Sequence, residues 1–189
     1  MIYPKDDPEH GIRVMDLRQF TEDTIDRGLV WNVIENIMGL KYPDDIDKID
    51  YVILPVNTDL YGDDDHGGAF EDFINLKLVY HLNSCRYVGS RVFKNCYSLS
   101  NSSIENCTFV DSHAFENCSN IQFTNLRKCT SIYPYAFANS GLTGNIDCSN
   151  AFLNGVSGDP NTGYNFYNTK IHSIKIRKLP QKKTNTKSI

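Results

Sequence analysis

The chain has 189 residues and a formal net charge of −4; 40% of its residues are hydrophobic and 22% are charged. This is ordinary for a globular protein with one domain and a real core, or a domain plus a small cap. No apolar run approaches the roughly 20 residues of a membrane helix, so we expect no membrane insertion. The N-terminus lacks the basic and apolar regions of a secretory signal. We therefore expect no classical export and a cytoplasmic or virion location.

The charge is divided unevenly along the chain. Residues 1–72 contain 18 acidic and 6 basic residues, a net charge of −12, whereas the remainder carries +8. Residues 170–189 contain seven Lys or Arg and no acid. Such a split is typical of solvated faces with complementary fields, or of a basic tail that docks on an acidic partner or on nucleic acid.

Residues 1–48 are predicted to form an acidic, α-helical cap. Thr21 is the expected N-cap, followed by two acidic residues in the first turn. Because the next segment is repetitive, its first coil must be covered, which a helical cap would do. Alternatively, this segment is a docking element that uses the single tryptophan, Trp31. The helical stripe consists of Leu29, Val33, Ile37 and Leu40.

Residues 49–177 repeat with a period of 22 residues. The clearest blocks are "VGSRVFKNCYSL" (88–99), "VDSHAFENCSNI" (110–121) and "IYPYAFANSGLT" (132–143). Several positions keep this step: Phe93, Phe115 and Phe137; Val88, Val110 and Ile132; Asn95, Asn117 and Asn139; Leu82, Ile104, Leu126 and Cys148; Cys85, Cys107 and Cys129. With Phe70 and Phe166 as outer rungs, we expect about five coils.

A 22-residue period is too short for a two-helix repeat and suits one strand with a tight return in each coil. Equivalent residues of successive coils should then stack about 4.8 Å apart, the spacing of paired strands. Each ladder of Phe, Val or Cys becomes an internal stripe, because a single coil cannot bury its own apolar side.

These blocks resemble the "IGxxAFxNCxxLxxIxIP" signature of BspA-like leucine-rich repeats over about residues 50–177. The resemblance implies a right-handed, parallel-stranded solenoid whose strands line one face, and a binding rather than a catalytic role. Members of this family are often bacterial or protist surface proteins that engage host or partner proteins. The Ile-x-Ile-Pro strand pattern is clear only at "VILP" (52–55). The predicted fold is a mainly β repeat solenoid over 49–177, with the cap before it and a basic tail over 178–189.

The six cysteines are predicted to be buried free thiols that act as small hydrophobes. They lie at ladder positions and form no Cys-x-x-Cys pair, so we expect neither a zinc site nor a cofactor. Cys118 has Ser140 at the next equivalent position, and we treat the two as interchangeable. The asparagine ladder is expected to bond turn backbone.

Catalytic and metal motifs are weak. Asp63, Asp64, Asp65 and His66 could surround a cation, but a solvated insertion loop explains them better. The five histidines occupy different coil positions, and only Asp111 is a carboxylate near His113. We expect no enzyme.

The predicted function is non-enzymatic protein–protein interaction, as a subunit of a larger assembly such as a phage virion. Alternatives are a cell-surface adhesin, a carbohydrate-binding module, and nucleic-acid binding through the tail. The predicted binding residues on the strand face are Lys77, Ser100, Ser102, Gln122 and Thr124, joined by Lys175 and Arg177 on the last strand. The predicted docking residues of the tail are Lys178, Lys182, Lys183 and Lys187.

Overall fold

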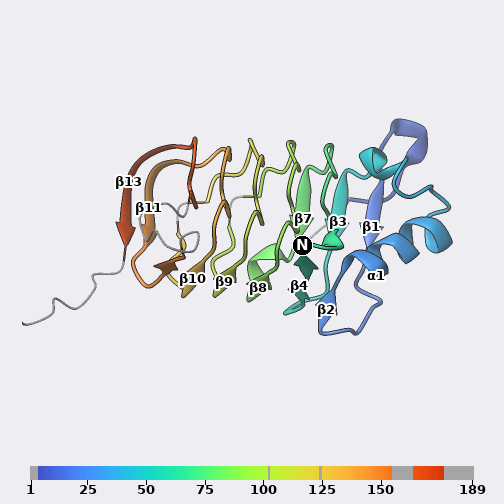
Figure 1. Cartoon of the computed structure of the whole chain (residues 1–189). Coiled ribbons are helices and arrows are strands. Elements are labelled where there is room, and N and C mark those ends of the chain that lie inside the picture. The colour runs from blue at the N-terminus through green and yellow to red at the C-terminus, as the bar shows by residue number, and fades with distance from the viewer. Residues whose placement is uncertain (1–3, 102, 124, 155–163, 177–189) are drawn as a thin grey trace, which may run out of the picture.

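The computed structural model describes residues 4–101, 103–123, 125–154 and 164–176, which form a stack of coils along one axis (Figure 1). The stack runs from β1 (Val14–Asp16) to β13 (Lys170–Ile176). Among the described strands, all pairs are parallel except the hairpin of β5 (Gly62–Asp63) and β6 (Gly67–Gly68). The chain is thus a parallel β repeat protein, as predicted.

The longest series of strands forms one side of the stack. Its six strands follow the order β12–β10–β9–β8–β4–β2. Val110 lies opposite both Val88 and Ile132, so neighbouring strands in these coils are offset by 22 residues. The register confirms the predicted period. The strands are β2 (Thr24–Ile25), β4 (Asp59–Leu60), β8 (Tyr87–Val88), β9 (Phe109–Val110), β10 (Ser131–Ile132) and β12 (Phe152–Leu153).

A second side carries β1, β3 (Tyr51–Ile53) and β7 (Leu78–Tyr80), and further along β11 (Thr143–Cys148) with β13. In the coil after β7, the side chain of Asn101 replaces strand pairing. Its Nδ2 donates to Val79 O at 2.7 Å, and its Oδ1 accepts from Val79 N at 2.9 Å. A buried polar side chain that bonds as a peptide group explains why "LSNSSI" lacks the apolar strand pattern.

The core consists of the predicted ladders. Phenylalanine rings stack from coil to coil with centroids 5.6, 5.3, 5.4 and 5.4 Å apart. These rings belong to Phe70, Phe93, Phe115, Phe137 and Phe166, so both outer rungs are confirmed. The valine and leucine ladders are buried beside them. Offset stacking of rings at this spacing adds to the free energy gained from burial.

All six cysteines are buried and free, which confirms the predicted thiol ladders. Cys118 Sγ donates to Phe93 O of the preceding coil at 3.0 Å, and Cys96 Sγ donates to Phe70 O at 3.1 Å. Ser140 is buried at the next rung, but its Oγ has no hydrogen-bond partner among the residues that the structure describes. Ser140 is therefore not interchangeable with Cys118.

The N-terminal segment differs in detail from the prediction. Its α-helix, α1 (Arg27–Asn32), begins after Asp26, whose carboxylate accepts from Leu29 N at 2.8 Å. The prediction of Thr21 as N-cap is wrong, because β2 pairs with β4 and keeps residues 24–25 extended. A π-helical turn, η2 (Val33–Ile37), follows and shifts the phase of the helix. Ile37 consequently leaves the predicted apolar stripe and is 55% exposed.

Short 3-10 helices complete the described elements. They are η1 (Pro8–His10), η3 (Ile46–Lys48) and η4 (Leu82–Ser84). Before residue 49, β1 pairs with β3 and β2 pairs with β4, so the N-terminal segment extends both sides of the stack. Within the described ranges, no helix has the length and apolar character needed to cross a membrane.

Candidate functional site

The predicted strand-face residues Lys77, Ser100 and Gln122 are all exposed and lie in successive coils. Lys77 Nζ is 2.7 Å from Asp50 Oδ1, and this hydrogen bond raises the pKa of the lysine. Ser100 Oγ donates to Lys77 O at 2.9 Å. The structure brings these three residues into one row, and two of them already bond within the fold.

The other predicted binding residues divide into two groups. Lys175 is exposed on β13, with its Nζ 3.7 Å from Asp147 Oδ2. The remaining ones lie outside the described residues and stay predictions: Ser102, Thr124, Arg177, Lys178, Lys182, Lys183 and Lys187.

The outer surface of the six-stranded sheet carries a row of aromatic side chains that sequence reasoning did not single out. Tyr87 and Phe109 stack with centroids 5.1 Å apart, and Phe109 and Tyr133 lie 4.9 Å apart. Tyr61 and Phe152, in the outer coils, are each 47% exposed. We call Tyr61, Tyr87, Phe109, Tyr133 and Phe152 the aromatic face.

Strand alternation places these rings outward. Val88 and Val110 point into the core, so the preceding residues Tyr87 and Phe109 must point out. The 22-residue spacing of Tyr87 and Phe109 is the sequence pattern that could have predicted this row. It was obscured because Ser131 holds the next equivalent position, and Tyr133, two residues later, supplies the ring instead.

Polar groups surround the aromatic face. Thr130 Oγ1 donates to Thr108 O and Thr108 Oγ1 donates to Arg86 O, each at 3.0 Å. The hydroxyl of Tyr87 donates to Asp111 Oδ2 at 3.0 Å. Burial, together with the nearby carboxylate, raises the pKa of this phenol. An aromatic centre with a polar rim has the composition of a protein-binding surface.

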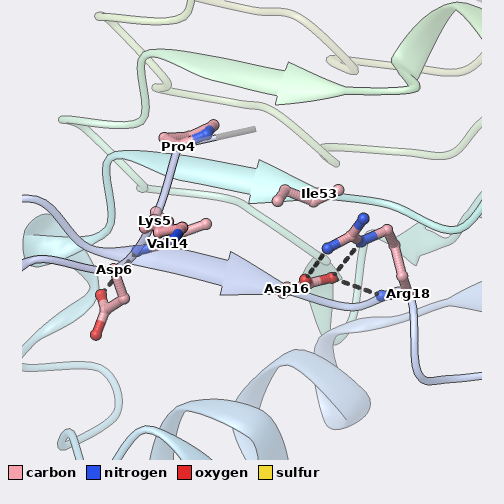
Figure 2. Close-up of a pocket in the computed structure, with 7 residues that line it drawn as sticks. All are labelled: Pro4, Lys5, Asp6, Val14, Asp16, Arg18 and Ile53. Carbon is pink, nitrogen blue, oxygen red and sulfur yellow. Dashed lines mark hydrogen bonds and ion pairs between the residues drawn. The ribbon is translucent and has the colours of Figure 1, made fainter. Parts of the chain in front are cut away.

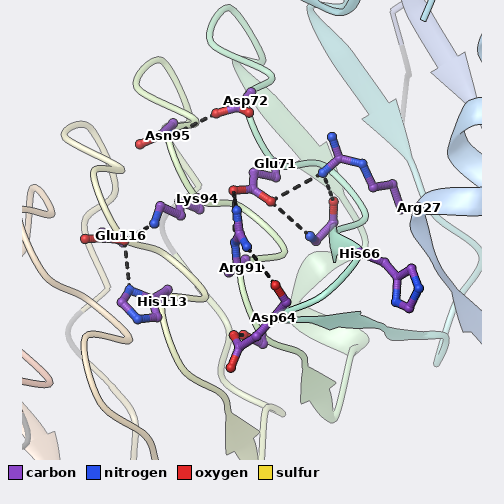
Figure 3. A network of polar contacts seen from close by, with 12 residues as sticks. Arg27, Asp64, His66, Glu71, Asp72, Arg91, Lys94, Asn95, His113 and Glu116 are labelled. Carbon is purple, nitrogen blue, oxygen red and sulfur yellow. Dashed lines mark hydrogen bonds and ion pairs between the residues drawn. The ribbon is translucent and has the colours of Figure 1, made fainter. Parts of the chain in front are cut away.

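A polar network connects the N-terminal helix with the coils (Figure 3). Glu71 is only 4% exposed, and its carboxylate lies 2.6 Å from Arg91 Nη2 and 3.3 Å from Arg27 Nη1. It also accepts from Gly68 N at 3.2 Å. Glu71 is paired with both arginines, so this network connects elements of the fold and holds no unpaired charged group that could act in catalysis.

The contacts of His113 are also structural. His113 Nδ1 is 2.8 Å from Glu116 Oε2, and Lys94 Nζ is 2.9 Å from the same oxygen (Figure 3). The carboxylate beside His113 is therefore Glu116 rather than Asp111. Burial raises the pKa of Glu116, but the bonds to Lys94 and His113 outweigh it and hold that pKa below its usual value. The imidazole ring stacks on Tyr135 at 4.9 Å.

The predicted insertion loop is the tight β5–β6 hairpin. Asp63 Oδ1 accepts from Asp65 N at 2.9 Å and from His66 N at 2.6 Å. Asp64 Oδ1 accepts from Ser90 Oγ at 2.8 Å, so the acidic side chains hold the hairpin and attach it to the next coil. Within the described part of the chain, no three residues of the types His, Cys, Asp and Glu group to hold a metal ion.

A pocket of about 530 Å³ lies beside β1 (Figure 2). Arg18 Nε donates to Asp16 Oδ1 at 2.9 Å, and this bond lowers the pKa of Asp16. Asp6 Oδ1 accepts from Val14 N at 3.1 Å. Both carboxylates are engaged within the fold, and the described residues of the lining include no histidine, cysteine or serine that could act as a nucleophile.

Residues 66–155 match the family model of the BspA type leucine rich repeat region, in 6 copies. No curated protein and no solved structure matches the chain significantly. The matched residues contain the Phe, Asn and Cys ladders whose stacking is described above. Residues 66–155 of this chain are therefore similar to the BspA-type leucine-rich repeat family.

Proposed function

We propose that this chain is a non-enzymatic module that binds another protein through its aromatic face, as a subunit of a larger assembly. In this proposal the stack is a right-handed solenoid whose first coil is covered by α1. The observation that carries the proposal is the row of partly exposed rings on one rigid sheet. Tyr and Phe are enriched at the centres of protein interfaces, because a rigid ring buries much area at little entropic cost. The leucine-rich repeat match supports a binding role.

The test compares two matched double variants of the full chain. Tyr61→Ser with Phe152→Ser removes two rings of the aromatic face that are each 47% exposed. Tyr97→Ser with Tyr167→Ser removes rings that are 47% and 54% exposed on the return side of the coils. Partners are captured from cells that make the protein and identified by mass spectrometry, after circular dichroism has shown that both variants are folded. We expect one partner to be lost with the first variant and kept with the second.

Loss of the partner with Lys77→Ala and Gln122→Ala instead would place binding on the strand face and contradict the aromatic-face proposal.

A glycan array distinguishes the carbohydrate-binding alternative. Glycan binding that disappears with Tyr61→Ser and Phe152→Ser, without a captured protein, would replace our proposal. The identity of the partner separates a particle subunit from an adhesin: the first captures other proteins of the particle, the second a protein of another cell surface.

A further inference from the structure

The last strand of the stack exposes apolar side chains at positions that the preceding strand buries. Ile174 of β13 lies opposite Ile146, and Ile176 lies opposite Cys148. Ile146 and Cys148 are 1% and 0% exposed, whereas Ile174 and Ile176 are 37% and 53% exposed. Among the described residues β13 pairs only with β11, so no strand covers its outer edge. An uncovered edge with apolar rungs is a template for another strand.

The side chains of β13 also indicate the charge of such a strand. Lys175 Nζ lies 3.7 Å from Asp147 on the inner neighbour, yet the lysine side chain is 68% exposed. Most of this side chain is therefore exposed, and Lys175 can also meet a carboxylate on the outer side. With Lys170, β13 carries two lysines and no acid. The complementary strand has apolar residues beside Ile174 and Ile176 and an acidic residue beside Lys175.

A second copy of the chain does not satisfy this requirement. A second β13 strand contains no acidic residue that could lie beside Lys175, so pairing of two copies would add positive charge without a carboxylate to balance it. The opposite end of the stack is covered, because Met15 is 0% exposed in a core that also contains Val30, Val33 and Ile34 of the helical segment. The two ends of the molecule therefore differ, and only the β13 end leaves apolar core rungs exposed within the described residues.

We propose that the outer edge of β13 binds an extended segment of another protein in which apolar and acidic residues alternate. The segment adds a strand to the stack, with backbone hydrogen bonds for affinity and the alternation for specificity. This site is separate from the aromatic face and goes beyond the function proposed above. Its failure and the failure of that function are distinguishable, because the two sites share no residue.

The probe is a labelled synthetic peptide of about ten residues that alternates isoleucine and glutamate, long enough to span the strand. A second peptide, with lysine in place of glutamate, is the charge control. Fluorescence anisotropy measures the binding of both to the full-length protein. We expect the glutamate peptide to bind at least about tenfold more tightly. Hydrogen exchange should show new protection of residues 170–176 when it binds.

Variants locate the binding. Lys175→Glu should reverse the preference between the peptides, and Ile176→Ser should weaken the glutamate peptide about tenfold through lost apolar contact. Lys128→Glu, an exposed charge reversal on another coil, and Tyr61→Ser with Phe152→Ser should leave binding unchanged. Equal affinity for both peptides, or indifference to both β13 variants, would overturn the proposal. So would protection, without peptide, of those amides of residues 170–176 that do not bond to β11, which would mean that the chain itself or a second copy covers the edge.

Discussion

Each coil turns at residues in the left-handed conformation, and an asparagine recurs at one of them. Asn95, Asn117, Asn139 and Asn168 have φ values of 63°, 63°, 53° and 52°. Asparagine tolerates this region better than other residues with a Cβ. The side chains form a ladder in which each Nδ2 donates to the Oδ1 of the preceding coil, at 2.6 Å for Asn117 and 2.9 Å for Asn139. The expectation that these amides bond turn backbone is therefore wrong.

Two substitutions of Asn117 separate the roles of its backbone and its side chain. Asn117→Gly keeps the left-handed turn but removes two ladder bonds, which should lower the free energy of unfolding by about 1–2 kcal/mol. Asn117→Ala adds the strain of a left-handed alanine, about 1 kcal/mol more. Urea denaturation monitored by circular dichroism measures both. Equal losses would mean that the turn conformation contributes nothing to the choice of asparagine.

The unpartnered hydroxyl of Ser140 predicts a stabilising substitution. Ser140→Cys should place Sγ near Phe115 O, as Cys118 Sγ lies near Phe93 O, and raise the free energy of unfolding by about 1 kcal/mol. The reverse change, Cys118→Ser, should create a second unpartnered hydroxyl and lower stability by a similar amount. Urea denaturation of both variants is the measurement. A Ser140→Cys protein less stable than the parent would show that the site cannot hold a thiol.

At the scale of elements, Glu71 connects three parts of the molecule that are distant in sequence: α1 through Arg27, the β5–β6 hairpin through Gly68, and the next coil through Arg91. Glu71→Gln should therefore loosen all three. Both arginine side chains remain partly exposed, so we expect a loss of about 2–3 kcal/mol, below the cost of breaking a fully buried pair.

The measurement for Glu71→Gln is urea denaturation with Trp31 fluorescence as the probe, because the tryptophan lies in α1 and its ring stacks on Tyr42 at 5.5 Å. Glu105→Gln, at an exposed acid, is the matched control and should change stability by less than about 0.5 kcal/mol. If Glu71→Gln and Glu105→Gln are equally mild, the network does not hold α1 to the coils.

The predictable elements are those that the 22-residue period repeats. Phe115 and Val110 have copies on both sides, so their burial and stacking follow from the pattern of the sequence. Asp26 and Glu71 have no copies: the start of α1 depends on β2 pairing with β4, and Glu71 is surrounded by residues from three elements. The aromatic face could be predicted only in part. Tyr87 and Phe109 keep the 22-residue period, but the next ring belongs to Tyr133, two residues after the equivalent position Ser131. The repeated sequence pattern predicts the structure of a coil. Contacts between unlike segments do not repeat, so the sequence alone does not predict them.

At the scale of the whole molecule, the two ends of the stack should differ in stability. In a repeat protein each coil is stabilised mainly by its neighbours, so unfolding begins at an end that lacks a cover. Met15 is fully buried near the N-terminal end, whereas Ile176 is 53% exposed at the other end of the described stack. Opening should therefore start at β13 and reach Cys148 first, the thiol in the strand that β13 covers.

Thiol labelling tests this order directly. Burial raises the pKa of Cys148 to about 11 and that of Cys85 still higher, so neither thiol should react while its coil is closed. In brief labelling with iodoacetamide in dilute urea, we expect Cys148 to be modified before Cys85, as measured by mass spectrometry of the digested protein. Simultaneous labelling of both would mean that the stack opens as one cooperative unit, and earlier labelling of Cys85 would mean that the N-terminal end is the weaker one. An added peptide that pairs with β13 should slow the labelling of Cys148 and leave that of Cys85 unchanged, because only the β13 end gains a neighbour.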